Sequence, residues 1–452
     1  LQHIQAGRLR AIAVTSGQRF DALPQVPTIA ETFDGFELNS WLAYTGSERI
    51  PPGVSEPAVT LIGEGRVSGR VQVDLELMGK KRGSGAVSAS HSGNAGGSPS
   101  PRPRIWTTMR TDSKLPVRPM GEVMRRYWQP ILMTSEIAEK DGAPVRVRLL
   151  GEDLIAFRDT NGKVGVLEEM CMHRGASLAL GRNENQGLTC VYHAWKFDTQ
   201  GHLLETPCEA VNPRQREFMA AIHAKAYPTR EAGGMLWVYL GARAQAPAFP
   251  WFEFNRLSGG HVYPRRAVLH YNWLQGLEAH LDAAHLPVLH SSAMQRFAGA
   301  LDSDSGLALK NLAPEMETDM TPYGMREAAL RAMPDGTRYA RMRQTILPFF
   351  TMVPSAPNSP CSGRAIIPID DEHTAEWYFL YREDRPISAK EIEAQWVGAS
   401  EDDDNFAANL GDVNNAWHQD RAAMSKGHWS GLTRCIPFED FTVSSSMGVF
   451  ND

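Results

Sequence analysis

The sequence predicts an α+β protein of two or three domains, in which a small β-rich domain precedes a region of mixed helices and strands. Its 452 residues exceed what one hydrophobic core usually supports. From Met109 onward, strand-like runs separated by tight turns cover 145–150, 154–159 and 164–168. A short amphipathic helix is predicted over 119–132, and a second helical pattern covers 278–285.

The three strand-like runs are justified by the turns between them. A first turn is expected at Gly151–Asp153 and a second at Thr160–Lys163. The second turn contains Asn161-Gly162, a pair that accepts the positive φ angles of a two-residue hairpin loop. Consecutive hairpins predict an antiparallel sheet in this region.

Composition and charge exclude several classes of protein. A net charge of −6 argues against a nucleic-acid-binding surface over the whole chain. No apolar run reaches the roughly 18 residues of a membrane helix, and no signal peptide is visible at the N-terminus. The five cysteines are too few and too scattered for a disulfide scaffold, so we expect a cytoplasmic protein.

The first 106 residues differ from the rest of the chain. The segment "HIQAGRLRAIAVTSGQRFDALPQVPTIAETFDGFELNSW" resembles part of the substrate-binding receptors of tripartite tricarboxylate transporters. We therefore expect 1–58 to be a receptor-like fragment. Residues 59–106 are expected to be a linker, because 14 of the 22 residues from Gly83 to Arg104 are Gly, Ser or Pro.

Two mixed pairs of thiol and imidazole side chains follow the predicted hairpins. Cys171-x-His173 and Cys190-x-x-His193 are separated by sixteen residues. Two Cys on one iron and two His on the other are the ligands of a Rieske [2Fe–2S] cluster. The alternative is a structural zinc site, but zinc fingers usually pair Cys with Cys and His with His. Cys208 lies outside this pattern.

A second cluster of metal-ligating residue types lies about 95 residues downstream. Glu278, Asp282 and His285 are spaced to share one face of a helix, and Pro287 is expected to disturb the helix so that His290 turns back towards His285. Two His and a later carboxylate form the facial triad of non-haem Fe(II) oxygenases. His280 is a competing candidate that lies off this face.

Residues 109–452 resemble the oxygenase components of Rieske ring-hydroxylating oxygenases, in particular the phthalate 4,5-dioxygenase group. The likeness is carried by the two ligand patterns and by "RVRLLGEDLIAFRD", "HRGASLALGRNE" and "IIPIDDEHTAEWYF". It implies a β-rich Rieske domain over 107–244, which includes the N-terminal helix, and a helix-grip catalytic domain with an antiparallel sheet over 245–452.

The resemblance also implies roles for individual carboxylates. Asp440 in "PFEDFTVSSSMG" matches the position of the third iron ligand, with Asp420 as the alternative. Asp282 matches a carboxylate that bridges an iron-ligand His and a cluster-ligand His of the neighbouring subunit. The resemblance accordingly implies a homotrimer or a multiple of it. Family members continue beyond the point matched by Asp452, so a truncated C-terminus is expected.

The expected reaction is hydroxylation of an aromatic, carboxylated substrate with O₂, and the alternative is O-demethylation by a monooxygenase of the same family. The chain contains no dinucleotide fingerprint, so a separate NAD(P)H-dependent reductase must supply electrons. A substrate carboxylate needs a cation, and the candidates are Arg326, Arg341, Arg343 and Arg364.

Two other classes of protein compete with an active oxygenase. A Rieske electron carrier, including an inactive truncated oxygenase, would explain the cluster but would leave Asp282, His285 and His290 without a role. A solute receptor would explain only residues 1–58.

Overall fold

The structure is a computed structural model. It describes residues 10–11, 19, 24–25 and 45–46, and residues 119–449 except 210–212, 298–308, 310, 334–335, 355–358 and 403. Near the N-terminus, the two-residue strands β1 (Arg10–Ala11) and β2 (Thr45–Gly46) pair antiparallel. The predicted linker at 59–106 lies outside the described residues. None of the described helices is long and apolar enough to cross a membrane.

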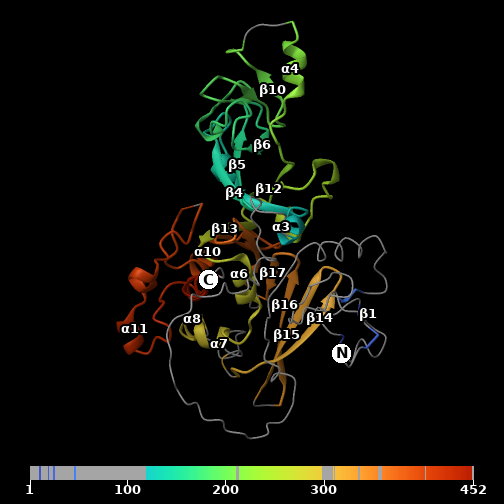
Figure 1. The fold of residues 1–452 in the computed structure, drawn as a ribbon. Helices are drawn as coiled ribbons and strands as arrows, with labels where there is room; N and C mark the ends of the chain where they lie inside the picture. Colours follow the sequence, from blue (N-terminus) through green and yellow to red (C-terminus); the bar gives the residue numbers. More distant parts are fainter. Residues whose placement is uncertain are drawn as a thin grey trace, which may run out of the picture. The chain divides into compact units, whose positions relative to one another are not determined.

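Three small antiparallel sheets follow helix α3 (Pro119–Met124). The first has the order β11-β12-β3, the second β4-β5-β6 and the third β10-β9-β8-β7. Figure 1 labels β4, β5, β6, β10 and β12 among these strands. Their bounds are β3 Trp128–Met133, β4 Val145–Leu149, β5 Glu152–Arg158, β6 Val164–Glu168, β7 Arg182–Glu184, β8 Gly187–Thr189, β9 Lys196–Phe197, β10 Leu203–Glu205, β11 Thr229–Ala232 and β12 Met235–Tyr239. The β-rich region predicted from the hairpins is therefore present.

The hairpin predictions need one adjustment. The first turn lies at Leu150 and Gly151, which both have positive φ, and β5 already begins at Glu152. A leucine tolerates this conformation here because its side chain is fully buried and its N–H donates to Pro368 O at 3.1 Å. The turn therefore begins at Leu150 because of a contact with Pro368, which is far along the chain and cannot be found from the local sequence.

The predicted helix over 119–132 is wrong beyond Met124. Residues Trp128–Met133 form β3, which pairs with β12 and is buried along its whole length. Because every side chain of this run is buried, it suits a strand covered on both faces better than an amphipathic helix. Tertiary pairing with β12 decides the outcome.

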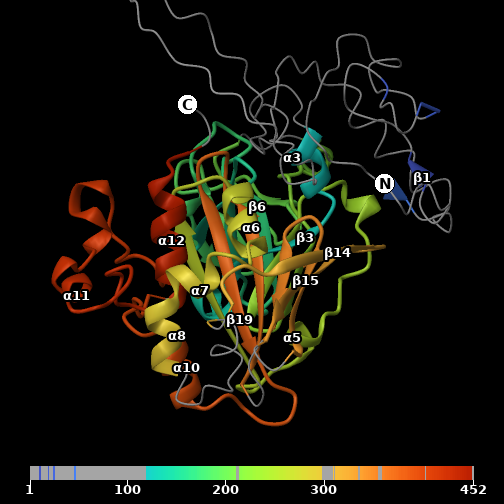
Figure 2. The same cartoon turned by 90° about the horizontal axis from the view of Figure 1, so that it is seen from below.

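A seven-stranded antiparallel sheet follows, with the order β13-β19-β18-β17-β16-β15-β14. Its strands are β13 Val262–Leu269, β14 Glu315–Thr321, β15 Gly324–Ala332, β16 Arg338–Ile346, β17 Phe350–Val353, β18 Cys361–Pro368 and β19 Thr374–Tyr381. Helix α6 (Trp273–Leu281) packs on β18 and β19, and α12 (Ile436–Ser446) packs against α6 (Figure 2). The expected combination of a β-rich domain with helices on an antiparallel sheet is confirmed.

The remaining helical segments are short. They are α4 Gln215–Ala221, α5 Glu253–Arg256, α7 Leu286–Leu289, α8 Ser291–Phe297, α10 Ala389–Gln395 and α11 Arg421–Ser425, with 3-10 turns η4 Thr134–Ile137, η5 Leu178–Leu180, η6 Arg243–Gln245 and η7 Val413–His418.

Two hydrophobic clusters support the two candidate ligand sets. One contains Cys171 and Cys190 together with Trp195 and Phe197, so these two aromatic side chains pack near the thiols. The other joins β13 and β19 to α12, and Phe441, the residue after Asp440, is completely buried in it. Each ligand set therefore rests on a packed core.

Candidate metal centres

The first candidate centre is built on two loops with the same backbone hydrogen bonds. In one, Cys171 N donates to Ala176 O and Gly175 N donates to Cys171 O, both at 2.9 Å. In the other, Cys190 N donates to Trp195 O at 2.8 Å and Ala194 N donates to Cys190 O at 2.9 Å. The fifth residue of each loop has a positive φ, 68° at Gly175 and 56° at Ala194. This repetition presents the two thiols from equivalent positions, while the imidazole comes from the third residue of one loop, His173, and from the fourth residue of the other, His193.

The side chains of these loops fit a cluster that bridges both pairs. Cys171 and Cys190 are 3% and 2% exposed, and neither forms a disulfide. Burial and the adjacent Cys190 raise the pKa of the Cys171 thiol to about 11. The rings of His173 and His193 lie 4.4 Å apart between centroids.

His173 is held in a defined orientation. Its ring stacks on Trp195 at 4.6 Å with 6° between the planes, and its Nε2 lies 3.7 Å from Glu209 Oε1. Its Nδ1 is buried and has no hydrogen-bond partner among the described residues. A buried imidazole nitrogen without a partner is a suitable donor atom for a metal.

The alternative of a single structural zinc ion fits this arrangement poorly. Tetrahedral zinc has bonds of about 2.0–2.3 Å, which would bring all four donor atoms within about 4 Å of one another. Within the described part of the chain, the one group of three donors gathered within 4.8 Å is His285, His290 and Asp440. Two similar loops that each supply one thiol and one imidazole fit two bridged irons, one held by the two Cys and the other by the two His.

The second candidate centre is that group of three. His290 Nε2 and His285 Nε2 lie 2.9 Å and 3.4 Å from Asp440 Oδ1. His285 precedes α7, His290 follows it, and Asp440 lies on α12. Two imidazoles and one carboxylate that face each other in this way fit a metal that keeps further positions open for O₂ or water.

The electrostatics of this group also suit a cation. Burial opposes protonation of His285 and His290, but hydrogen bonds and the charge of Asp440 raise their pKa values to about 9 and about 10. The same histidines hold the pKa of the Asp440 carboxyl far below its usual range, although its burial acts in the opposite direction. A metal bound here would replace protons and keep the buried carboxylate neutralised.

Each histidine of the group has a second carboxylate at its other ring nitrogen. His285 Nδ1 lies 3.1 Å from Asp282 Oδ2, and His290 Nδ1 lies 2.8 Å from Glu439 Oε2. Glu439 is completely buried and also accepts a hydrogen bond from Ser430 Oγ at 2.6 Å. Carboxylates in these positions fix the tautomer and ring orientation of a metal-binding histidine.

The prediction that Glu278, Asp282 and His285 share one helical face is wrong. Helix α6 ends at Leu281, and Asp282 is its C-cap with ψ of 124°. The Asp282 carboxylate instead accepts from the N–H groups of Ala284 and His285, at 2.7 Å and 3.2 Å. Pro287 lies in the first turn of α7, where its missing N–H costs nothing. Asp282 and His285 therefore meet through a cap rather than along a helix.

The competing candidates have structural roles. Asp420 caps the N-terminus of α11 by accepting from Ala423 N at 2.8 Å. His280 Nε2 lies 2.8 Å from Glu376 Oε2, and Glu376 is only 1% exposed. Cys208 is exposed and outside both groups.

Two contacts around the second centre are not evident from the sequence. Glu439 directly precedes Asp440, and this acidic pair is the available signal. The sequence suggests Arg343 only as a substrate-binding cation, yet its terminal nitrogens donate to the backbone at the end of α6. Sequence contains no signal for such a contact between a strand and a distant helix end.

Comparisons with known proteins agree with this organisation. A Rieske [2Fe-2S] domain model matches residues 127–225, and a model described as LigXa C-terminal domain like matches 238–452. A tripartite tricarboxylate transporter family receptor model matches 1–59, which confirms the resemblance of that segment.

Two curated relatives match most of the chain. The phthalate 4,5-dioxygenase oxygenase subunit of Pseudomonas putida is 37% identical over 351 residues, 74% of this chain and 77% of that one. The 3-chlorobenzoate-3,4-dioxygenase oxygenase subunit of Comamonas testosteroni is 34% identical over 357 residues, 74% of this chain and 79% of that one. Among solved structures, the terminal oxygenase of carbazole 1,9a-dioxygenase from Novosphingobium sp. KA1 has a TM-score of 0.46 and 19% identity, covering 72% of this chain and 84% of that one.

A Rieske domain joined to this catalytic domain defines the terminal component of an iron-dependent oxygenase. The chain belongs to the Rieske-type aromatic ring-hydroxylating oxygenases and is similar to the phthalate 4,5-dioxygenase group. Its cofactors are a Rieske [2Fe–2S] cluster and a mononuclear iron.

Proposed function

We propose that this chain hydroxylates an aromatic, carboxylated substrate with O₂, using electrons from a separate NAD(P)H-dependent reductase. When bound, the cluster supplies one-electron transfer and the mononuclear iron supplies O₂ activation. The observation that carries the proposal is the group of His285, His290 and Asp440, downstream of paired Cys and His loops. We assign the cluster to 107–244 and the catalytic iron to 245–452, with 1–58 a receptor-like fragment and 59–106 a linker.

We assign Cys171, His173, Cys190 and His193 as the cluster ligands. The paired loops present two buried thiols, and the unpartnered Nδ1 of His173 is available for a metal. His285, His290 and Asp440 are the proposed ligands of the mononuclear iron. The ligand carboxylate is 16% exposed and lies within hydrogen-bond distance of His290, which holds both groups in place before a metal arrives.

Asp282 is the proposed bridge to the cluster of a neighbouring subunit in a homotrimer or a multiple of it. Its side chain is 49% exposed, although it contacts the ring of His285. A carboxylate that is anchored on one side and exposed on the other is suited to receive a histidine from a second chain. The sparse cysteines favour the cytoplasm as the compartment.

Arg364 is the proposed partner of a substrate carboxylate. It lies on β18 and is 9% exposed, and its Nε has no partner among the described residues. Thr351 on β17 is the register partner of Arg364, and Thr345 on β16 is the register partner of Thr351. The buried hydroxyls of both threonines also have no hydrogen-bond partner among the described residues. A substrate carboxylate would accept hydrogen bonds from this row of donors.

The row of donors lies near the proposed iron site. The Arg364 guanidinium stacks over the ring of Tyr378 at 4.0 Å. The Tyr378 ring in turn contacts Phe441, which is next to Asp440 on α12, at 5.7 Å. The other candidate cations are less suitable: Arg326 is paired with Asp319 on an exposed strand face, and Arg341 donates to Pro354 O.

The first test is the content of iron and acid-labile sulfide in anaerobically purified protein. About three irons to two sulfides per chain are expected for a cluster plus one mononuclear iron. In His285→Ala, the cluster absorbance should remain while one iron and substrate oxidation are lost. Zinc without sulfide, or unchanged turnover in the variant, would contradict the proposal.

The second test concerns the substrate. Phthalate and 3-chlorobenzoate, the acids named in the two relatives, are suitable probes. Arg364→Leu should raise KM for such an acid at least about tenfold, because a charge-assisted hydrogen bond is worth about 1.5–3 kcal/mol. Arg326→Leu is the matched control on the exposed face and should leave KM unchanged.

O-demethylation is the alternative reaction. The 5,5'-dehydrodivanillate O-demethylase oxygenase subunit of Sphingobium sp. (strain NBRC 103272 / SYK-6) is 32% identical over 321 residues. Product analysis with ¹⁸O₂ separates the two reactions, since hydroxylation leaves label on the ring and demethylation releases a labelled one-carbon product.

A further inference from the structure

Two buried arginines hold the backbone between helix α6 and His285. The last carbonyls of a helix lack partners within the helix. At the end of α6, the carbonyls of the four consecutive residues 280–283 instead accept hydrogen bonds from arginines on two neighbouring sheet strands. Side chains from the sheet therefore cap this helix end.

The two arginines divide the four carbonyls between them. Arg343 on β16 donates from Nη1 to His280 O and Asp282 O, each at 2.8 Å, and from Nη2 to Leu281 O. Arg331 on β15 donates from Nη2 to Ala283 O at 3.1 Å. Arg343 is 9% exposed and Arg331 is completely buried. Two positive charges at a helix C-terminus also oppose the negative end of its dipole.

This backbone segment leads directly to a proposed iron ligand. With its carbonyls held, the main chain at Asp282 is fixed, and the Asp282 carboxylate then accepts from the N–H of His285 at 3.2 Å. The same carboxylate oxygen lies 3.1 Å from His285 Nδ1. A continuous series of contacts therefore runs from the sheet to the ring of His285.

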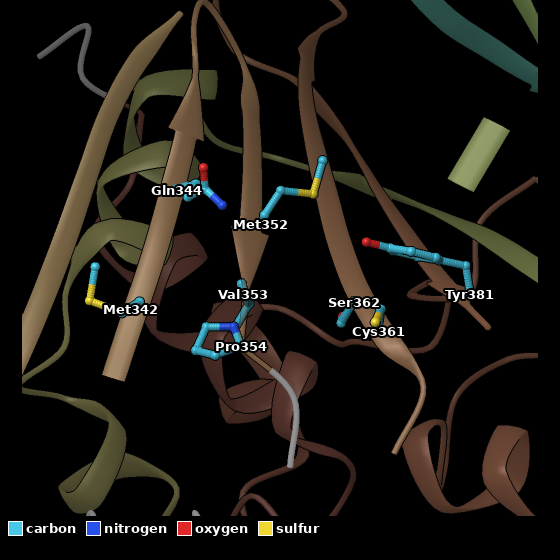
Figure 3. Close-up of a pocket in the computed structure, with 8 residues that line it drawn as sticks. All are labelled: Met342, Gln344, Met352, Val353, Pro354, Cys361, Ser362 and Tyr381. Atoms are coloured by element: carbon cyan, nitrogen blue, oxygen red, sulfur yellow. The ribbon is translucent and has the colours of Figure 1, made fainter. Parts of the chain in front are cut away.

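The geometry leaves Arg343 poorly placed to bind a substrate carboxylate. Both of its terminal nitrogens already donate to carbonyls at short distances. Its neighbours Met342 and Gln344 point to the opposite face of the strand, where they line the pocket shown in Figure 3. That pocket contains none of the proposed ligands, whereas the Arg343 guanidinium faces the end of α6.

We propose that Arg343, together with Arg331, is a positioning residue that orients His285 by holding the carbonyls of 280–283. The inference rests on the proposed function, because His285 matters as an iron ligand. The proposal adds a specific expectation. Loss of the Arg343 guanidinium, whose two terminal nitrogens hold the carbonyls, weakens iron binding and turnover without weakening substrate binding.

The test compares Arg343→Met and Arg343→Lys with Arg338→Met. Arg338 lies on the same strand but is exposed and paired with Glu315, so its loss controls for charge and for strand stability. The readouts are loss of the mononuclear iron to a chelator under anaerobic conditions, the EPR spectrum of its nitric oxide adduct, and kcat and KM for phthalate or 3-chlorobenzoate.

In Arg343→Met, iron should be lost about tenfold to a hundredfold faster, as for other residues that orient metal ligands. The nitric oxide spectrum should broaden and kcat should fall, with KM within about twofold of the parent value. Arg343→Lys should recover part of the loss, because it keeps the charge but not the fork. Should Arg343→Met fail to fold, the lysine variant carries the same comparison.

A tenfold rise in KM with normal iron retention would overturn the proposal and make Arg343 a substrate ligand. Hydrogen exchange of the amides at 282–285 in metal-free protein separates this inference from the proposed function. Faster exchange in Arg343→Met than in Arg338→Met supports positioning even if the wild-type chain holds no mononuclear iron. Equal exchange in the two variants would contradict it.

Discussion

At the residue scale, the two proposed iron-ligand histidines are held by carboxylates in very different surroundings. Asp282, the partner of His285, is half exposed, whereas Glu439, the partner of His290, is completely buried and bonded to Ser430. A buried hydrogen bond is stronger and a buried group left without a partner is more costly. His290 is therefore the more rigidly held ligand, and Asp282 remains available to another chain.

Glu439→Gln should weaken Fe(II) binding about tenfold to a hundredfold, because the amide can no longer accept equally well from both His290 and Ser430. Titration of metal-free protein with Fe(II) measures this change. Glu401→Gln, at an exposed position, is the control and should bind like the parent. An unchanged dissociation constant in Glu439→Gln would show that Glu439 does not orient His290.

Ala194→Gly should stabilise the protein. Ala194 has a φ of 56°, a conformation that costs an L-residue about 1–2 kcal/mol and that glycine adopts freely. After the entropy of glycine is counted, a gain of about 0.5–1 kcal/mol is expected, seen as a rise of a few degrees in Tm. Ala138→Gly, at a φ of −66°, should instead lower the Tm. A lower Tm for Ala194→Gly would contradict this account.

At the scale of elements, the hairpin of β4 and β5 is joined to the turn between β18 and β19. Leu150 N and Gly151 N donate to Pro368 O and Ile369 O at 3.1 Å and 2.8 Å. Asp370 strengthens this joint, because Arg148 donates to its Oδ2 at 3.1 Å and His373 contacts its Oδ1 at 2.9 Å. Burial alone would raise the pKa of Asp370, but the hydrogen bonds from His373 and from the N–H of Glu372 outweigh it and lower the pKa to about 2.

The lowered pKa of Asp370 predicts a contribution to acid stability. Its folded value lies below the unfolded value near 3.8, so the stabilisation is present above the unfolded pKa and is lost as pH falls towards about 2. Asp370→Asn should be less stable than the parent at neutral pH by about 1–2 kcal/mol, with the difference shrinking between about pH 5 and pH 2. Urea unfolding across pH measures it.

Glu372→Gln is the control for this experiment, since Glu372 is exposed in the same turn. Its unfolding free energy should follow that of the parent across the whole pH range. A constant difference between Asp370→Asn and the parent would exclude the carboxylate charge as the cause.

At the scale of the whole molecule, the proposed function requires that the cluster of one subunit serves the iron of the next. Complementation between two inactive variants tests this requirement. Cys171→Ala should lose the cluster but keep the iron site, and His285→Ala should do the reverse. Coexpressed, they should form mixed oligomers in which about a quarter of the pairings between subunits are intact, if chains assort randomly.

Activity near a quarter of the parent value is therefore expected from the mixture. A chain that carries both substitutions, coexpressed with itself, is the control and should be inactive. If the mixture is also inactive although an affinity tag on one variant captures the other, electron transfer within one chain would replace the proposed route.

The candidate ligand residues of this protein can be predicted from its sequence more directly than the contacts that bring them together. The mixed Cys and His pairs, His285 and His290 can be identified along the chain as candidate ligands, because metal ligands are few in kind and regular in spacing. Asp440 is proposed only through the resemblance of its segment to the family. The hairpins of β4 to β6 are also predictable, since Asn-Gly turns and strand-like runs are local signals.

The way in which these residues meet depends on tertiary contacts. Such contacts make Trp128–Met133 a strand, place Glu439 beside His290, and bring Arg343 to the end of α6 at Leu281. Each of these outcomes depends on partners 100 or more residues away or on a neighbouring sheet, as with β12 for β3 and α12 for His290. Long-range contacts override local preference because burial and hydrogen bonding across the fold outweigh propensities of less than about 1 kcal/mol per residue.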